Sequence, residues 1–190
     1  LKMTPSLFSV IVKTPAFSVE SCSTLRLVVL GGEPINTRDV ERAHQACPHI
    51  RFMNHYGPTE TTIGSVAGKI DFQRWETYKK NPVIGNPIGG TMVFILDRHL
   101  NLMPPGAAGE LCIGGAGVAG GYLNRAELTA EKFLSFDRAD RSYRAYISKK
   151  IYKTGDLARW HPQGEIEFLG RIALQVKIRG YRSELGEIEN

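Results

Sequence analysis

The sequence gathers oxygen-bearing side chains in one short turn. The segment from Tyr56 to Thr62 reads YGPTETT and joins a sharp turn to hydroxyl groups and a carboxylate, directly after an expected strand. Such a loop can offer backbone amides, the hydroxyl of Thr59 and the hard oxygen ligands of Glu60 to a phosphate group and its Mg²⁺. For an isolated turn the simpler interpretation is that Thr59 only caps the local backbone, so the chemistry depends on what surrounds it.

A βαβ unit is predicted to position this turn. Residues 25–30 form an apolar run that ends at a glycine pair, which is typical of a buried parallel strand. Asn36 or Thr37 can cap a following helix, and residues 50–53 form a second strand. Ligand sites in such units lie beyond the carboxyl ends of the strands, which is where segment 54–57 begins.

The pattern changes after residue 91 to short apolar strands separated by turn residues, which predicts a small antiparallel β unit. Residues 124–133 are rich in helix formers. The expected strands are 92–96, 110–113, 151–154, 165–169 and 174–178. The predicted fold class is therefore α/β, a βαβ sheet with a small β-barrel-like unit, and we expect a domain boundary near Gly170.

Composition narrows the class of protein. Hydrophobic residues make up 42% and charged residues 23%, as in globular proteins. No apolar run approaches the roughly 18 residues of a membrane span, and the first residues do not form a signal peptide, so we expect no membrane partner and a cytoplasmic location. The net charge of +5 is spread over 24 basic and 19 acidic residues, which does not favour a nucleic-acid partner. Cys22, Cys47 and Cys112 lack metal-ligand spacing and are expected to be free thiols.

Five segments, in order, resemble the adenylation domains of nonribosomal peptide synthetases. Asn54 to Glu60 matches the signature Asn-x-Tyr-Gly-Pro-Thr-Glu of that family. The other four matches are residues 84–88, the glycine-rich segment 109–125, the segment YKTGD at 152–156, and residues 170–189. The resemblance covers nearly the whole chain. It implies that residues 1–169 are the C-terminal part of the large core subdomain and residues 170–190 the hinge and the beginning of a mobile C-terminal subdomain.

The resemblance also implies the nucleotide site. Glu60 would bind Mg²⁺, Thr59 would contact the phosphates, and the two carboxylate oxygens of Asp156 would accept hydrogen bonds from the ribose hydroxyls. Arg171 would supply donors near the nucleotide, and Tyr56 would lie along the adenine or the acyl group. The residues implied to bind ATP are Gly32, Glu33, Pro34, Asn54, Tyr56, Gly57, Asp156 and Arg171. The alternative is that Glu60 is a surface acid, Asp156 forms a turn and Arg171 is solvated, while the glycine pair simply ends a strand.

A substrate pocket follows from the same resemblance. The implied lining residues are Val29, Gly31, His55, Ile63 and Gly64, with Lys2 a less secure member. His55 could narrow the pocket or offer a hydrogen-bond donor, and the alternative is a core histidine satisfied by a backbone carbonyl. The implied reaction is activation of an amino acid, or a related carboxylic acid, by ATP as an acyl-adenylate.

The implied partners are a peptidyl carrier domain, whose phosphopantetheine thiol receives the acyl group, and an MbtH-like activator protein. The activator would dock on residues 123–129 around Ala126, which could also be a plain helix former. The family's products suggest antibiotic biosynthesis. Ala173 stands at the hinge where the family usually has Asp, and Gly120 replaces a common Arg.

Two other functions stay open. One is an acyl- or aryl-CoA ligase of the same superfamily, against which the sequence QVKIRG at 175–180 weighs. The other is a noncatalytic adenylation domain that only docks partners. We expect the natural protein to continue in both directions and to need both the family's upstream phosphate loop and its C-terminal Lys, so the fragment alone is predicted to be inactive.

Overall fold

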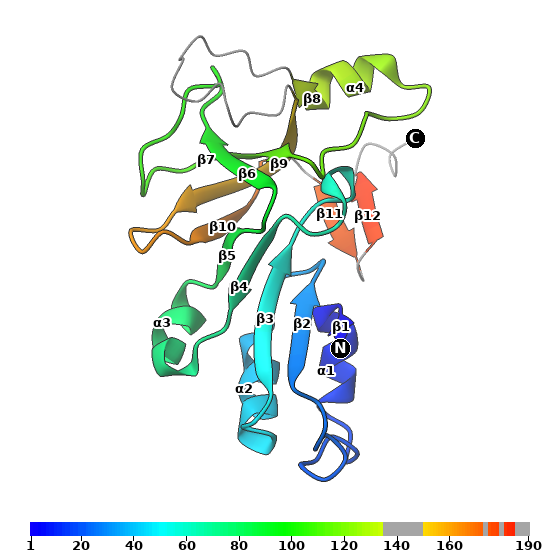
Figure 1. Cartoon of the computed structure of the whole chain (residues 1–190), viewed down its shortest axis with the longest axis vertical. Helices are drawn as coiled ribbons and strands as arrows, with labels where there is room; N and C mark the ends of the chain where they lie inside the picture. The colour runs from blue at the N-terminus through cyan, green and yellow to red at the C-terminus, as the bar shows by residue number, and fades with distance from the viewer. Residues whose placement is uncertain (135–149, 173–174, 179–180, 185–190) are drawn as a thin grey trace. The chain divides into compact units, whose positions relative to one another are not determined.

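The computed structural model describes residues 1–134, 150–172, 175–178 and 181–184, the last two ranges by their backbone only (Figure 1). The chain divides into two compact units. The first contains Leu1–Tyr56, Ala67–Gly85 and the described residues 175–178 and 181–184, and the second contains Gly57–Val66 and the described residues from Asn86 to Ile172. The candidate site residues are therefore described within one unit at a time.

The first unit is built on a parallel sheet. Strands β1 (Lys2–Met3), β2 (Leu27–Gly31) and β3 (Arg51–Tyr56) pair in parallel, with Leu30 opposite Asn54 in the β2–β3 register. Helices α1 (Pro5–Ile11) and α2 (Thr37–Ala46) connect and accompany these strands (Figure 1). The predicted strand, helix and strand are confirmed, and β3 extends three residues further than expected, as far as Tyr56.

Local sequence explains both helices. The Thr4 hydroxyl caps α1 by accepting the Leu7 N–H, and Pro5 occupies the first turn, where its missing N–H costs nothing. The Asn36 side chain accepts the Arg38 N–H at 3.1 Å, as expected of the predicted cap. The inward faces of the helices and strands form one hydrophobic core, which consists of Phe8, Val12, Val28, Leu30, Val40, Ala43, Cys47, Ile50, Phe52, Ile70, Trp75, Tyr78 and Val83.

Two further strands and a short helix, which lie largely in the first unit, were not predicted. They are β4 (Val66–Lys69), α3 (Trp75–Lys80) and β5 (Val83–Pro87). The backbones of β4 and β5 approach so closely that a Cβ on Gly68 would lie 2.7 Å from the Gly85 Cα. Glycine is therefore required at that crossing.

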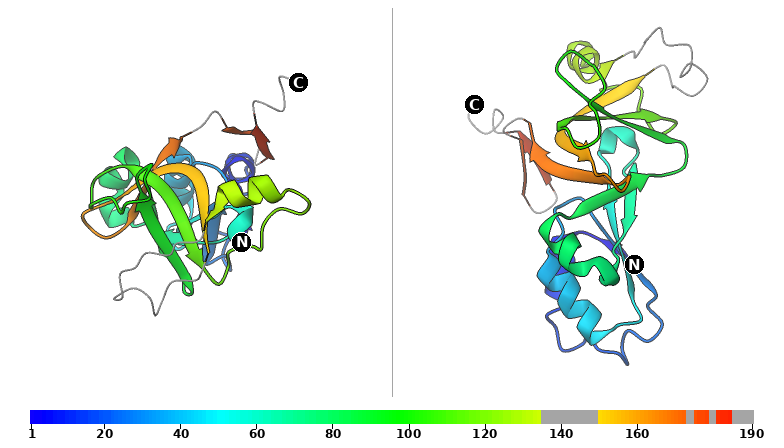
Figure 2. Two further views of the ribbon diagram at one scale, coloured as in Figure 1. Left: turned by 90° about the horizontal axis from the view of Figure 1, so that it is seen from above. Right: turned by 90° about the vertical axis from the view of Figure 1, so that its left-hand side faces the viewer.

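The second unit is an antiparallel sheet, as predicted. Its strands are β6 (Thr91–Leu96), β7 (Gly109–Gly115), β8 (Phe133–Leu134), β9 (Ile151–Trp160) and β10 (Ile166–Arg171). Strand β9 lies between β7 and β10, and β8 also pairs with β9 (Figure 2). Helix α4 (Ala126–Lys132) leads directly into β8. The helix predicted at 124–133 is thus confirmed with slightly shorter bounds.

Strand β9 carries an irregularity at residues 154–156. On its β7 side, Glu110 pairs with Leu157 whereas Cys112 pairs with Lys153, so these three residues bulge out of the ladder. Gly155 within the bulge has a φ of 70°, which glycine adopts without strain. The Thr154 hydroxyl fixes the bulge by donating to the Leu111 carbonyl and accepting the Asp156 N–H. Bulges of this kind re-aim side chains, and this one includes Asp156.

The end of the chain forms a two-stranded antiparallel sheet of β11 (Gln175–Ile178) and β12 (Tyr181–Glu184). Gly170, near which the domain boundary was predicted, lies inside β10, and the boundary itself stays a prediction. The predicted hinge residue, Ala173, lies outside the described residues. Among the described residues, no helix is both long and apolar enough to cross a membrane.

Candidate nucleotide site

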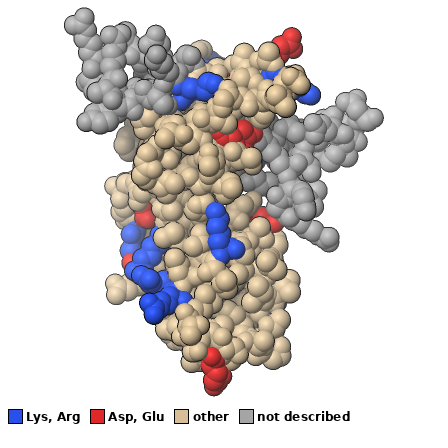
Figure 3. Space-filling view, turned by 45° about the vertical axis from the view of Figure 1, so that its right-hand side comes forward, with Lys and Arg blue, Asp and Glu red and all other residues tan. Residues whose placement is uncertain are grey.

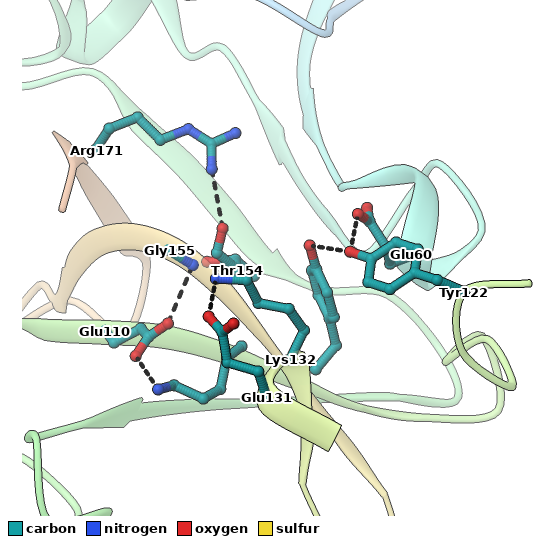
Figure 4. Close-up of polar contacts among 10 residues, drawn as sticks. Glu60, Glu110, Tyr122, Glu131, Lys132, Thr154, Gly155 and Arg171 are labelled. Carbon is teal, nitrogen blue, oxygen red and sulfur yellow. Dashed lines mark hydrogen bonds and ion pairs between the residues drawn. The ribbon is translucent and has the colours of Figure 1, made fainter. Parts of the chain in front are cut away.

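Glu60 is held in a short turn in the second unit. After β3 the chain forms the 3-10 helix η1 (Thr59–Thr61), and only 7% of Glu60 is exposed. The Tyr122 hydroxyl donates a hydrogen bond to Glu60 Oε1 at 2.6 Å (Figure 4). Burial, followed by this hydrogen bond, raises the pKa of Tyr122 well above its ordinary value. The phenol consequently stays protonated and can keep donating to the carboxylate.

The glycine-rich segment holds the backbone of the same turn. The Ala119 N–H donates to the Glu60 carbonyl at 2.8 Å, and the Thr62 hydroxyl donates to the Gly117 carbonyl at 2.8 Å. A Cβ on Gly117 would lie 3.0 Å from the Thr61 carbonyl oxygen, so the two segments are in close backbone contact. The structure therefore brings together two segments that resemble the family at separate places in the sequence, residues 54–60 and 109–125.

The residues around Glu60 differ in exposure. Thr59 is exposed, which leaves its side chain accessible, and Gly57 is in tight contact because an added Cβ would lie 2.3 Å from the Ile63 carbonyl oxygen. Ile63 itself is 61% exposed and Gly64 is half-buried. Thr62 and Ile63 both have positive φ values, 61° and 69°. Left-handed conformations are uncommon for β-branched residues such as Thr62 and Ile63. Two in succession indicate that the backbone directly after η1 is constrained.

Asp156 and Arg171 form an ion pair on neighbouring strands. The Arg171 Nε lies 2.8 Å from Asp156 Oδ1, and the Asp156 side chain is 4% exposed against 19% for Arg171. Arg171 also donates from Nη1 to the Thr154 carbonyl at 2.9 Å (Figure 4). The predicted ribose-binding Asp and nucleotide-binding Arg thus contact each other directly. Their pairing fixes the carboxylate of Asp156 at the β9 bulge.

A second polar group supports the same bulge. Glu110 Oε1 accepts the Gly155 N–H at 3.1 Å, while its other oxygen lies 3.4 Å from Lys153 Nζ (Figure 4). Glu110 comes from β7, so the bulge is contacted from both neighbouring strands.

The other predicted nucleotide residues belong to the first unit. Asn54 is buried and its amide donates to the Val83 carbonyl at 3.0 Å and to the Tyr78 hydroxyl at 3.3 Å. Glu33 accepts hydrogen bonds from both the backbone N–H and the hydroxyl of Ser6, at the start of α1. These contacts give Asn54 and Glu33 architectural roles within the unit. Gly32 and Pro34 are exposed, and Tyr56 is half-buried.

Gly31 and His55 meet at the end of the parallel sheet. They are register partners in β2 and β3, and a Cβ on Gly31 would lie 2.3 Å from the His55 carbonyl oxygen. Burial lowers the pKa of His55, and the positive charge of Lys2 lowers it further. The imidazole therefore favours its neutral form. Val29, in the middle of β2, is half-buried, and its register partner Lys2 in β1 is exposed.

The donor set suits one particular kind of metal site. Among the described residues no group of three or more His, Cys, Asp or Glu side chains could enclose a metal ion. Mg²⁺ is commonly held by one or two carboxylates together with substrate phosphates and water, rather than by a full set of protein ligands. A single nearly buried carboxylate with a fixed orientation, such as that of Glu60, fits this pattern.

The sequence did not single out Tyr122 or the Asp156–Arg171 pair. Tyr122 was part of a matched glycine-rich segment, but nothing in the spacing indicates a contact with a residue 62 positions earlier. The three cysteines are free, as predicted, and burial raises the pKa of Cys112 to about 12. On the face drawn in Figure 3, Lys and Arg side chains form small groups separated by uncharged surface.

Comparisons with known proteins identify the family of the chain. The family model of AMP-binding enzymes matches residues 1–123. Bacitracin synthase 3 of Bacillus licheniformis is 54% identical over the whole chain, which spans 3% of that protein, and surfactin synthase subunit 2 of Bacillus subtilis (strain 168) is 46% identical, with the chain spanning 5% of it.

Solved structures give the same result. A holo NRPS protein containing adenylation and PCP domains, bound to a vinylsulfonamide inhibitor, has a TM-score of 0.86 at 34% identity, over 99% of this chain and 31% of that one. An artificially fused adenylation-PCP di-domain NRPS from Klebsiella oxytoca has a TM-score of 0.82 at 29% identity, over 100% of this chain and 33% of that one. The chain therefore belongs to the AMP-binding enzyme family, among the adenylation domains of nonribosomal peptide synthetases.

Proposed function

We propose that this chain is part of a domain that activates an amino acid, or a related carboxylic acid, with ATP. The observation that carries the proposal is the buried Glu60 carboxylate, fixed by Tyr122 in the segment that matches the family signature. Its relatives at 46% to 54% identity are peptide synthetases, which supports an amino acid as substrate.

In the proposed reaction an oxygen of the substrate carboxylate forms a bond to the α-phosphorus of ATP while the bond to the bridging oxygen breaks. Pyrophosphate leaves with that bonding electron pair, and the acid becomes a mixed anhydride with AMP. Bound Mg²⁺ would neutralise negative charge on the phosphate oxygens. Glu60 would hold that ion, and the exposed Thr59 hydroxyl would donate to a phosphate oxygen. The chain's contribution is positioning and charge neutralisation.

Asp156 and Arg171 would serve the nucleotide sugar. The ion pair and the bulge hold the Asp156 carboxylate at one place on β9, where its oxygens could accept hydrogen bonds from the ribose hydroxyls. Arg171 places its positive charge beside that carboxylate, with Nε 2.8 Å from Oδ1.

The acyl group would then pass to the thiol of a phosphopantetheine on a peptidyl carrier domain, which displaces AMP and forms a thioester. Two solved relatives are described as adenylation-PCP proteins, which supports a carrier partner. An MbtH-like activator is a further proposed partner. Ala126 is exposed and begins α4, and Leu123, three residues earlier, is 89% exposed, so both side chains are accessible to a docking protein.

Glu60→Gln tests the proposal in a complete adenylation domain that contains this chain. The substitution keeps the shape and removes the charge that would bind Mg²⁺. Amino-acid-dependent exchange of pyrophosphate into ATP should fall at least about tenfold, which corresponds to roughly 1.4 kcal/mol of transition-state stabilisation. Unchanged exchange in a folded variant would remove Glu60 from the site.

His55→Ala tests the substrate pocket. The residues proposed to line it are Val29, Gly31, His55, Ile63 and Gly64, of which only His55 has a polar side chain. Assayed with a panel of acids, the variant should change the order of preference, because an imidazole both fills space and donates a hydrogen bond. An unchanged order would place His55 outside the pocket. If the wild-type domain favoured acyl or aryl acids with coenzyme A, that would point to the CoA-ligase alternative. If the wild-type domain turned over no acid, that would point to the docking-only alternative.

A further inference from the structure

A tyrosine from the glycine-rich segment contacts the carboxylate on which the proposed function rests. Glu60 has a flexible side chain, and a carboxylate that binds a metal ion with fixed geometry needs support from surrounding groups. The Tyr122 hydroxyl lies 2.6 Å from Glu60 Oε1, within the short range typical of a hydroxyl that donates to an ionised carboxylate. Because a hydrogen bond to an ionised acceptor is directional, it restricts where Oε1 can lie.

Tyr122 is itself well supported. Its backbone N–H donates to the Thr129 hydroxyl of α4 at 2.9 Å, and its ring packs edge-to-face against Phe133 of β8, with centroids 5.4 Å apart. Its hydroxyl also lies 3.4 Å from the hydroxyl of Tyr152, which is fully buried in β9. Helix α4, strand β8 and strand β9 therefore fix the backbone, ring and hydroxyl of one side chain.

The residue before Tyr122 is a glycine that allows the glycine-rich segment to lie close to α4. Gly121 has a φ of 143°, and a Cβ there would lie 2.4 Å from the Thr129 Cγ2. Only glycine allows the glycine-rich segment to come close enough to α4 for the Tyr122 N–H to reach Thr129. The same segment donates the Ala119 N–H to the Glu60 carbonyl, so Glu60 is held at both its backbone and its side chain.

We propose that Tyr122 is a positioning residue for the metal site: its hydroxyl orients the Glu60 carboxylate so that the other face of the carboxylate binds Mg²⁺ in the complex with ATP. The inference rests on the proposed function, because it requires Glu60 to bind Mg²⁺. It predicts that Tyr122 affects Mg²⁺ binding only through Glu60.

The test uses Tyr122→Phe in a complete adenylation domain that contains this chain. The variant removes the hydroxyl and keeps the ring against Phe133. Calorimetric titration with ATP is carried out twice, in excess Mg²⁺ and in EDTA. We expect the Kd in Mg²⁺ to rise about tenfold, as for the loss of a hydrogen bond to a charged group, while the Kd in EDTA stays within about twofold. The Mg²⁺ concentration for half-maximal pyrophosphate exchange should rise with it.

Two comparisons separate positioning from a structural role. Tyr152→Phe removes the next hydroxyl along and should change the Mg²⁺-dependent Kd less than Tyr122→Phe does. In a double-mutant cycle, Tyr122→Phe should have no further effect once Glu60 is Gln, since the two groups then no longer interact through a charge. Additive losses, or equal weakening in EDTA, would overturn the inference.

The outcomes also separate this inference from the proposed function. If Glu60→Gln leaves Mg²⁺-dependent binding intact, the role of Glu60 fails and the role of Tyr122 fails with it. If Glu60→Gln weakens binding and Tyr122→Phe does not, only the role of Tyr122 is refuted. Should Tyr122→Phe not fold, Thr129→Ala replaces it, because it removes the acceptor of the Tyr122 N–H and keeps the phenol. Unchanged Mg²⁺-dependent binding in that variant would then refute the inference.

Discussion

The Nε atom of Arg171 lies 2.8 Å from Oδ1 of Asp156, across the β9–β10 pair, and both side chains are largely buried. Removing one member of such a pair leaves a charge without compensation. Arg171→Leu should therefore lower the free energy of unfolding by roughly 2–3 kcal/mol, less than for a fully buried pair because Arg171 keeps some solvent contact. Urea denaturation of a domain that contains the chain would measure the change.

Lys132→Leu is the matched control for Arg171→Leu. It breaks the pair with Glu131, whose side chain is 63% exposed, so the expected loss is at most about 1 kcal/mol. Adding Asp156→Asn to Arg171→Leu should restore part of the stability, because the stranded charge is gone. Equal losses for Arg171→Leu and Lys132→Leu would contradict the importance of burial at this pair.

His55 should make stability depend on pH in a defined direction. Burial and then Lys2 lower its pKa in the folded protein, so on acidification the unfolded chain takes up the proton first, near the ordinary value of about 6.5. The contribution of the neutral imidazole is present above that pH and is lost as pH falls toward the lowered folded value. Compared with the wild type, His55→Gln should lose less stability between pH 8 and pH 5. Identical pH profiles would show that His55 does not titrate differently on folding.

Gly31→Ala should separate strands β2 and β3. The added methyl carbon would lie 2.3 Å from the His55 carbonyl oxygen, a backbone atom that cannot move without breaking the pairing register. We expect a loss of at least about 2 kcal/mol in the free energy of unfolding. Gly120→Ala is the control, since its Cβ would meet nothing within 4 Å, and its effect should stay within about 0.5 kcal/mol. Equal stability of the two variants would show that the strand ends can adjust.

Ala126→Glu tests whether the proposed MbtH-like activator docks at Ala126. Ala126 is an exposed first residue of α4, so a glutamate there fits the free domain and even favours the helix N-terminus. In a desolvated protein interface the same charge would be costly. Co-expression with a tagged MbtH-like protein should recover the wild-type domain and not the variant. Equal recovery of both, or of neither, would exclude docking at Ala126, and an unchanged melting temperature would verify that the variant folds.

Local signals predicted the parts of the fold that depend on neighbouring residues. Asn36 caps α2 because its short side chain reaches the backbone two residues on, and a run of β-branched and apolar residues makes β2 a buried strand. Helix α3 was not predicted, because a six-residue helix is too short to show a clear hydrophobic periodicity. Its Trp75 and Tyr78 are buried among residues that are distant in the sequence.

The site shows the same division. Glu60 and Asp156 could be proposed from the sequence because their motifs are contiguous, whereas the groups that contact them lie elsewhere in the sequence. Tyr122 and Arg171 reach them only after distant strands and turns have folded, and a register shift between Phe168 and Gly170 decides that Arg171 faces Asp156. Register and bulges depend on tertiary packing, which local spacing does not encode.

The separation of 62 residues between Glu60 and Tyr122 has a consequence for synthesis. A ribosome adding about 5–20 residues per second needs roughly 3–12 s to extend the chain from the first residue to the second. During that interval the chain contains the Glu60 carboxylate without the Tyr122 phenol that contacts it, and α4 and β8 must follow before the phenol is itself supported. Nascent chains halted before residue 122 has left the ribosome should therefore show the Glu60 turn open to proteases, and chains long enough for β9 to have left it should show the turn protected.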